Sequence, residues 1–166
     1  MSAAQESDIG KPKFAMYWAA SCGGCEIAVL NINEKILDVD ANFDIAFWPV
    51  AMDAKYKDVE AMDDQSILLT LFNGGIRNKE NEEIAHLLRK KSQILVAFGS
   101  CACEGCIPGL ANLSKPEDIF NTVYNSVSTE NPENLRPQWD YKMPEGMIHI
   151  PQFYPVLRTL DQDRKS

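Results

Sequence analysis

Four short apolar runs, separated by stretches long enough to form helices, constrain the fold of this chain more than any other feature. The runs cover residues 14–18, 44–48, 67–72 and 93–98. They are continuously apolar rather than alternating, which is typical of strands that helices cover on both faces. The sequence therefore predicts an α/β fold: a doubly wound parallel sheet with helices on both faces.

Helices are predicted between and after these runs. They cover residues 26–37, 78–91, 116–126 and 151–160, with a short helix within 51–65. The first has two apolar faces, one of them carrying Ile27, Leu30 and Leu37, so we expect it to be covered on two sides. Residues 128–146 contain three prolines and are predicted as a loop.

All five cysteines lie in two glycine-rich segments, and each segment directly follows a predicted strand. The cysteines are Cys22 and Cys25 in the first segment and Cys101, Cys103 and Cys106 in the second. Ligands of open parallel sheets bind beyond the carboxyl ends of the strands, and these ends share one edge. We therefore expect thiols from both segments to contribute to one site. The turn Asn73-Gly74-Gly75 lies on the same edge, either as a plain turn or as a backbone contact to that site.

Composition excludes several classes of function. An odd number of cysteines without an export signal favours metal or redox chemistry over disulfides, and it predicts a cytoplasmic protein. The formal net charge of −8 disfavours nucleic-acid and membrane-surface binding, and no apolar run is long enough to span a bilayer. We expect one domain, residues 13–166, after a flexible polar arm, residues 1–12.

Three kinds of chemistry suit the cysteine segments. The Cys-x-x-Cys pair of Cys22 and Cys25 fits a thioredoxin-like redox site, but that motif gives the second cysteine segment no role. Four thiolates from two loops fit a structural zinc site. An iron–sulfur cluster also fits, because its sulfurs accept hydrogen bonds from backbone N–H groups, which Gly23 and Gly24 let approach closely. Residue chemistry alone leaves the last two alternatives open.

Three motifs together carry a resemblance to a known family. They are Ser-Cys-Gly-Gly-Cys-Glu at 21–26, Gly-Ser-Cys-Ala at 99–102 and Ile-Pro-Gly-Leu-Ala-Asn at 107–112. From residue 14 to residue 162, the chain resembles the small subunit of cytoplasmic nickel–iron hydrogenases. It is most similar to the F420-non-reducing (methyl-viologen-reducing) branch, which serves heterodisulfide reductase complexes.

The resemblance implies a flavodoxin-like domain that holds a proximal 4Fe–4S cluster. It implies that Cys22, Cys25 and Cys101 are ligands of that cluster. The cluster would take electrons from the nickel–iron centre of a separate large subunit and pass them to a downstream electron-transfer protein. Glu26 matches an acidic residue that the family places at the contact with the large subunit and associates with proton transfer; a carboxylate stabilised by a helix N-terminus is the alternative.

The fourth ligand departs from the family pattern. The family supplies it from a later Gly-Cys-Pro turn, whereas no cysteine follows Cys106. We expect a chain that lacks the family's last segment; the alternatives are a ligand from Cys103 or Cys106, or one from elsewhere, including a partner chain. The related subunit of respiratory complex I fits less well, because it has two adjacent cysteines where this chain has Cys22-Gly23-Gly24-Cys25. A zinc-stabilised or metal-free docking module without a redox role is the alternative function.

Overall fold

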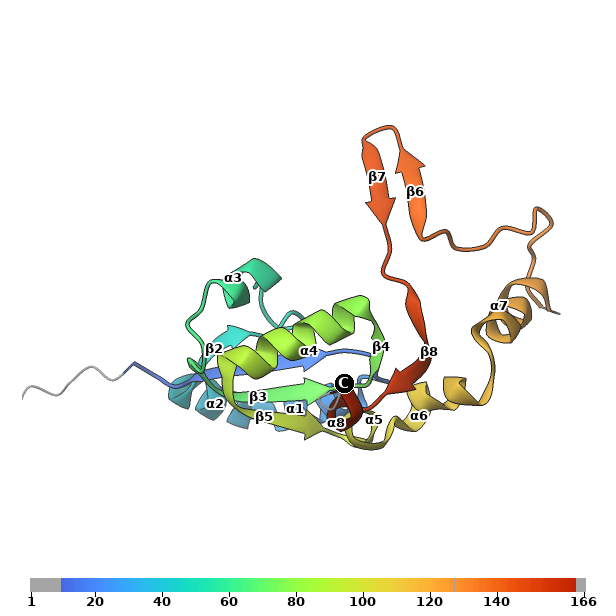
Figure 1. The fold of residues 1–166 in the computed structure, drawn as a ribbon. Helices are drawn as coiled ribbons and strands as arrows, with labels where there is room; N and C mark the ends of the chain where they lie inside the picture. The colour runs from blue at the N-terminus through green and yellow to red at the C-terminus, as the bar shows by residue number, and fades with distance from the viewer. Residues whose placement is uncertain (1–9, 127, 164–166) are drawn as a thin grey trace, which may run out of the picture.

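A four-stranded parallel sheet forms the centre of the protein (Figure 1). The computed structural model describes residues 10–126 and 128–163, so most of the expected N-terminal arm, residues 1–9, lies outside the described part. In spatial order the strands are β2 (Asp44–Phe47), β1 (Lys13–Trp18), β3 (Ile67–Asn73) and β5 (Ser92–Phe98). The second, first, third and fourth parallel strands thus lie side by side, which is the order of a flavodoxin-like sheet. The predicted fold class is confirmed, and all four apolar runs form its strands.

The remaining strands form two antiparallel pairs outside this sheet. They are β4 (Ile76–Asn78) with β8 (Phe153–Arg158), and β6 (Asp140–Met143) with β7 (Gly146–His149). The hairpin of β6 and β7 projects from the body of the protein (Figure 1), and all its residues are exposed.

Helices cover both faces of the central sheet. The helices are α1 (Gly24–Leu30), α2 (Ile36–Asn42), α3 (Tyr56–Glu60), α4 (Lys79–Lys91), α5 (Ser100–Glu104), α6 (Cys106–Gly109), α7 (Pro116–Asn125) and α8 (Leu160–Asp163), with 3-10 turns η1 (Asn33–Lys35) and η2 (Leu110–Leu113). The helix α4 begins where the Asn78 side chain accepts a hydrogen bond from the Asn81 backbone N–H at 2.9 Å. In the described part of the chain, no helix has the length and apolar character needed to cross a membrane.

The core lies on both sides of the sheet. On one side, Ile84 and Leu88 of α4 pack with Tyr17 and Phe72 from the strands. On the other side, residues of α1 and α2 pack against Met16, Trp48 and neighbouring strand residues. Leu69 and Leu71 of β3 pack on the α1 side and Phe72 packs on the other side, so side chains alternate between the faces from Leu69 to the end of β3.

Two helix predictions were wrong. The helix expected over residues 26–37 is interrupted near Asn33, which adopts a left-handed backbone conformation with a φ of 53°, as asparagine does more readily than most residues. Contrary to expectation, Ile27, Leu30 and Leu37 are exposed rather than covered. The helix expected over 151–160 is instead mainly the strand β8.

A proline and the pairing of β8 with another strand explain why the helix predicted over 151–160 was wrong. Pro155 lacks the N–H that a helix interior requires, but an edge strand tolerates it. The strand β8 pairs with β4, which the sequence did not predict as a strand. Ion pairing adds to this attachment, because Arg158 contacts Glu82 of α4 at 2.8 Å. The predicted loop over 128–146 likewise contains β6, which is paired only with β7 in the described residues.

Candidate functional site

The two cysteine segments lie at the carboxyl-terminal edge of the sheet. The first follows β1 and continues into α1, and the second follows β5 and continues into α5. Since β3 lies between β1 and β5, the end of β3 separates the two segments. Residues almost eighty positions apart in the sequence therefore meet around one short stretch of sheet edge.

The side chain of Cys25 is in contact with the second segment. A Cβ atom placed on Gly99 would lie only 2.1 Å from the Cys25 Sγ. Gly99 has a φ of 84° and a ψ of 166°, a conformation that is essentially restricted to glycine. The sulfur thus occupies the space that glycine leaves open, two residues before Cys101.

The five thiols differ in exposure. Cys101 is buried and Cys25 is partly buried, whereas Cys22, Cys103 and Cys106 are exposed. Burial raises the pKa of the Cys25 thiol, and negative charge on Cys101 and then on Cys22 raises that pKa further. Burial and negative charge from both segments thus disfavour the Cys25 thiolate, and a bound cation would favour it.

Cys103 and Cys106 differ in their local contacts and in their backbone conformation. The Cys103 thiol donates a hydrogen bond to the carbonyl of Ala97 at 3.3 Å, so it is directed toward the carboxyl-terminal end of β5. Cys106 begins α6 with a φ of 37°, an uncommon conformation for a residue with a side chain. Of the two, Cys106 has the stronger effect on the pKa of Cys25.

Glu26 follows Cys25 directly and is only 2% exposed. Its Oε1 accepts a hydrogen bond from the indole N–H of the buried Trp48, and its Oε2 has no partner among the described residues. An unpaired buried carboxylate oxygen is costly, and such groups are concentrated at functional sites.

Asn73 is a residue of this edge whose side chain the sequence analysis did not single out. It is fully buried at the end of β3, and its Oδ1 accepts a hydrogen bond from the Ser21 hydroxyl at 2.9 Å. The Ser21 Oγ in turn accepts from the Gly23 backbone N–H at 3.1 Å, which ties the first cysteine segment to β3. The sequence signal that could have identified Asn73 was its position at the end of an apolar run between the two cysteine segments.

The donors at this edge fit an iron–sulfur cluster in their chemistry. They combine soft thiols from two segments with a buried amide donor, the Asn73 Nδ2, that has no partner among the described residues. Within residues 10–126 and 128–163, however, no three His, Cys, Asp or Glu side chains are gathered closely enough to hold a metal ion. The structure brings Cys25 to the second segment and leaves the Cys22 side chain exposed at the surface.

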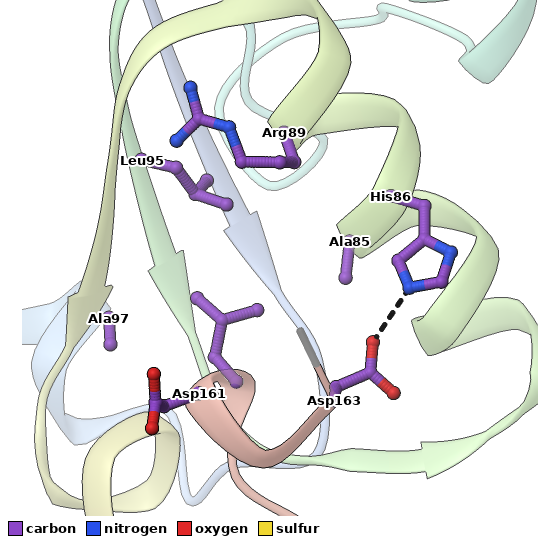
Figure 2. Close-up of a pocket in the computed structure, with 8 residues that line it drawn as sticks. Ala85, His86, Arg89, Leu95, Ala97, Asp161 and Asp163 are labelled. Carbon is purple, nitrogen blue, oxygen red and sulfur yellow. Dashed lines mark ion pairs between the residues drawn. The ribbon is translucent and has the colours of Figure 1, made fainter. Parts of the chain in front are cut away.

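A separate pocket of about 130 Å³ lies between α4, β5 and α8, and no cysteine lines it. Figure 2 shows His86 of α4 directed at Asp163 of α8, with 3.1 Å between Nε2 and Oδ2. Burial raises the pKa of the Asp163 carboxyl, although Arg158 and His86 oppose that shift. These contacts attach α8 to α4 and are distinct from the cysteine edge.

Comparison with known proteins identifies relatives of this chain. Residues 22–159 match the family described as "NADH ubiquinone oxidoreductase, 20 Kd subunit". The iron–sulfur subunit of the F420-non-reducing hydrogenase of Archaeoglobus profundus is 45% identical over 152 residues, which cover 90% of this chain and 47% of that protein. The corresponding F420-non-reducing hydrogenase subunit of Methanothermobacter thermautotrophicus is 37% identical over 92% of this chain and 47% of its own length.

This chain therefore spans about half the length of these relatives. Among solved structures, a chain of an NAD+-reducing nickel–iron hydrogenase in the H2-reduced state superimposes with a TM-score of 0.74. It shares 23% identity and is matched over 92% of this chain and 77% of that chain, a likeness that shows the fold. The resemblance to F420-non-reducing hydrogenase subunits, predicted from the cysteine motifs, is confirmed.

Proposed function

This chain belongs to the family of the 20 kDa subunit of NADH ubiquinone oxidoreductase, and on that premise we propose that it is the electron-transfer small subunit of a nickel–iron hydrogenase. Cys22, Cys25 and Cys101 would hold a proximal 4Fe–4S cluster, which supplies one-electron transfer when bound. The observation that carries the proposal is the contact between the Cys25 sulfur and Gly99, because it joins the two cysteine segments at one edge.

The proposed partners follow from this role. A nickel–iron large subunit would contain the centre that splits dihydrogen, and a downstream electron-transfer protein, linked to heterodisulfide reductase, would accept the electrons. The relatives named as F420-non-reducing hydrogenase subunits support this assignment. We place the complex in the cytoplasm.

The surface around Glu26 supports a contact with the large subunit. Glu26 is buried with a carboxylate oxygen that lacks a partner among the described residues, and it lies in the first turn of α1, on which Ile27 and Leu30 are exposed. Covering these apolar side chains would remove them from water, and the Glu26 carboxylate would then lie close to the interface. In this position Glu26 can accept and release a proton at its Oε2 as electrons pass.

For the fourth ligand we propose Cys106 ahead of Cys103, with a ligand from another segment or a partner chain as the alternative. The Cys103 thiol already donates to the Ala97 carbonyl.

Metal analysis of protein produced without oxygen tests the proposal. We expect the chain to take up about four iron atoms and four sulfides when both are supplied, and to show the paramagnetic signal of a reduced cluster after dithionite treatment. A parallel preparation supplied with zinc is the control. Stoichiometric uptake of zinc with no uptake of iron would contradict the redox role and favour a zinc-stabilised docking module.

A further inference from the structure

We infer that the side-chain amide of Asn73 donates a hydrogen bond to a sulfur atom of the proposed cluster and raises its reduction potential. This inference rests on the proposed function and adds a positioning and tuning residue that contributes no ligand. It is independent of which residue supplies the fourth ligand.

The sheet places Asn73 between the two cysteine segments. In the register of the parallel strands, Asn73 pairs with Trp18 on one side and with Phe98 on the other. Phe98 immediately precedes Gly99, the residue whose open space holds the Cys25 sulfur. Asn73 is thus the residue of β3 that lies level with the exits of β1 and β5.

The side chain of Asn73 lies on the face of the sheet that α1 covers. Leu69 and Leu71, four and two residues earlier on β3, pack in the cluster that contains Val29 of α1. Because side chains alternate along a strand, Asn73 points to the same face. Its contact with the Ser21 hydroxyl, next to Cys22, agrees with this direction.

The amide has one satisfied end and one unsatisfied end. Its Oδ1 accepts from Ser21, while its Nδ2 is buried and has no hydrogen-bond partner among the described residues. The Ser21 hydroxyl donates to this oxygen while its Oγ accepts from the Gly23 backbone N–H, so the two contacts hold the amide beside the first cysteine segment. A buried N–H donor without a partner is unfavourable unless a ligand accepts from it.

The chemistry of the expected ligand matches this donor. Thiolate and sulfide sulfurs of a cluster carry negative charge and accept hydrogen bonds, and N–H donors to them are a recognised means by which a protein sets the potential. Reduction adds one more negative charge, so a fixed donor stabilises the reduced state more than the oxidised state. Removing the donor therefore lowers the potential.

The first experiment needs no variant. The full chain is labelled with asparagine carrying 15N only in the side-chain amide, loaded with iron and sulfide without oxygen, reduced, and examined by pulsed electron paramagnetic resonance. We expect a 15N coupling to the cluster that is absent from a sample labelled in the same way on glutamine. A cluster without this coupling overturns the inference alone, whereas failure of the unsubstituted protein to form a cluster overturns the proposed function as well.

Two substitutions assign the coupling and measure its effect. Asn73→Leu removes both polar ends, and Asn73→Asp keeps the oxygen that faces Ser21 while it replaces the donor. We expect both to lose the 15N coupling and to shift the potential downward. Ser21→Ala loses the contact that holds the amide but keeps the Nδ2 donor, so we expect a smaller loss of coupling and a smaller shift of the potential than in Asn73→Leu. An unchanged potential in both Asn73 variants, or an equal downward shift in Ser21→Ala, would contradict a role for the donor.

Discussion

Replacing Gly99 with alanine is expected to abolish incorporation of an iron–sulfur cluster. The new Cβ would stand 2.1 Å from the Cys25 Sγ and 3.3 Å from its Cβ, so the Cys25 side chain would be forced away from the second segment. Alanine would also be strained at a φ of 84° and a ψ of 166°, at a cost of about 1–3 kcal/mol in the free energy of unfolding. Iron and sulfide per chain, together with denaturant unfolding, measure the two effects.

Gly109→Ala is the matched control for this substitution. A Cβ on Gly109 would meet no atom within 4 Å, and its φ of −68° suits any residue. We expect the Gly109 variant to load iron and sulfide as fully as the unsubstituted protein. Full loading of the Gly99 variant would show that the Cys25 contact with the second segment has no part in holding the cluster.

Substituting serine for Cys25 or for Cys101 is expected to reduce the iron content by about tenfold or more, since even residues outside the ligand set change metal affinity by about ten- to a hundred-fold. Each substitution removes a thiolate from a different segment, so equal losses would indicate a shared centre. Both residues are at least partly buried, so circular dichroism must show that each variant remains folded.

Cys103→Ser is the control for the two ligand substitutions. Its thiol donates to the Ala97 carbonyl, and a serine hydroxyl can make the same hydrogen bond. We expect the Cys103 variant to keep its iron and sulfide. Loss of iron from this variant alone, with retention in the Cys25 and Cys101 variants, would show that the metal is bound at Cys103 and not at Cys25 and Cys101.

The four strands of the central sheet were predictable because their signal is local and strong. The central strands β1 and β3 are largely buried between helices, and such burial leaves a continuous apolar sequence. The edge strands β2 and β5 are only partly buried, although their sequences are also apolar runs. The strand β8 was not predictable in this way. Its sequence contains Pro155 and exposed residues, and it is a strand because β4 pairs with it across more than seventy residues.

The site was predictable in location but not in detail. Strand order places the two cysteine segments at one edge, as the sequence predicted from the rule for parallel sheets. The contact of Cys25 with Gly99 and the direction of the Cys103 thiol depend on backbone angles that no sequence pattern encodes. Asn73 escaped notice because its importance comes from burial and from a donor that no described residue accepts.

Alkylation of individual cysteines, before and after loading with iron and sulfide, tests the shared centre most directly. In the unloaded chain, exposure predicts rapid labelling of Cys22, Cys103 and Cys106 and slow labelling of Cys101, as followed by peptide mass spectrometry. After loading, the account predicts that Cys22, Cys25, Cys101 and Cys106 become protected together, in proportion to bound iron, while Cys103 stays reactive. Protection confined to one of the two segments would contradict it.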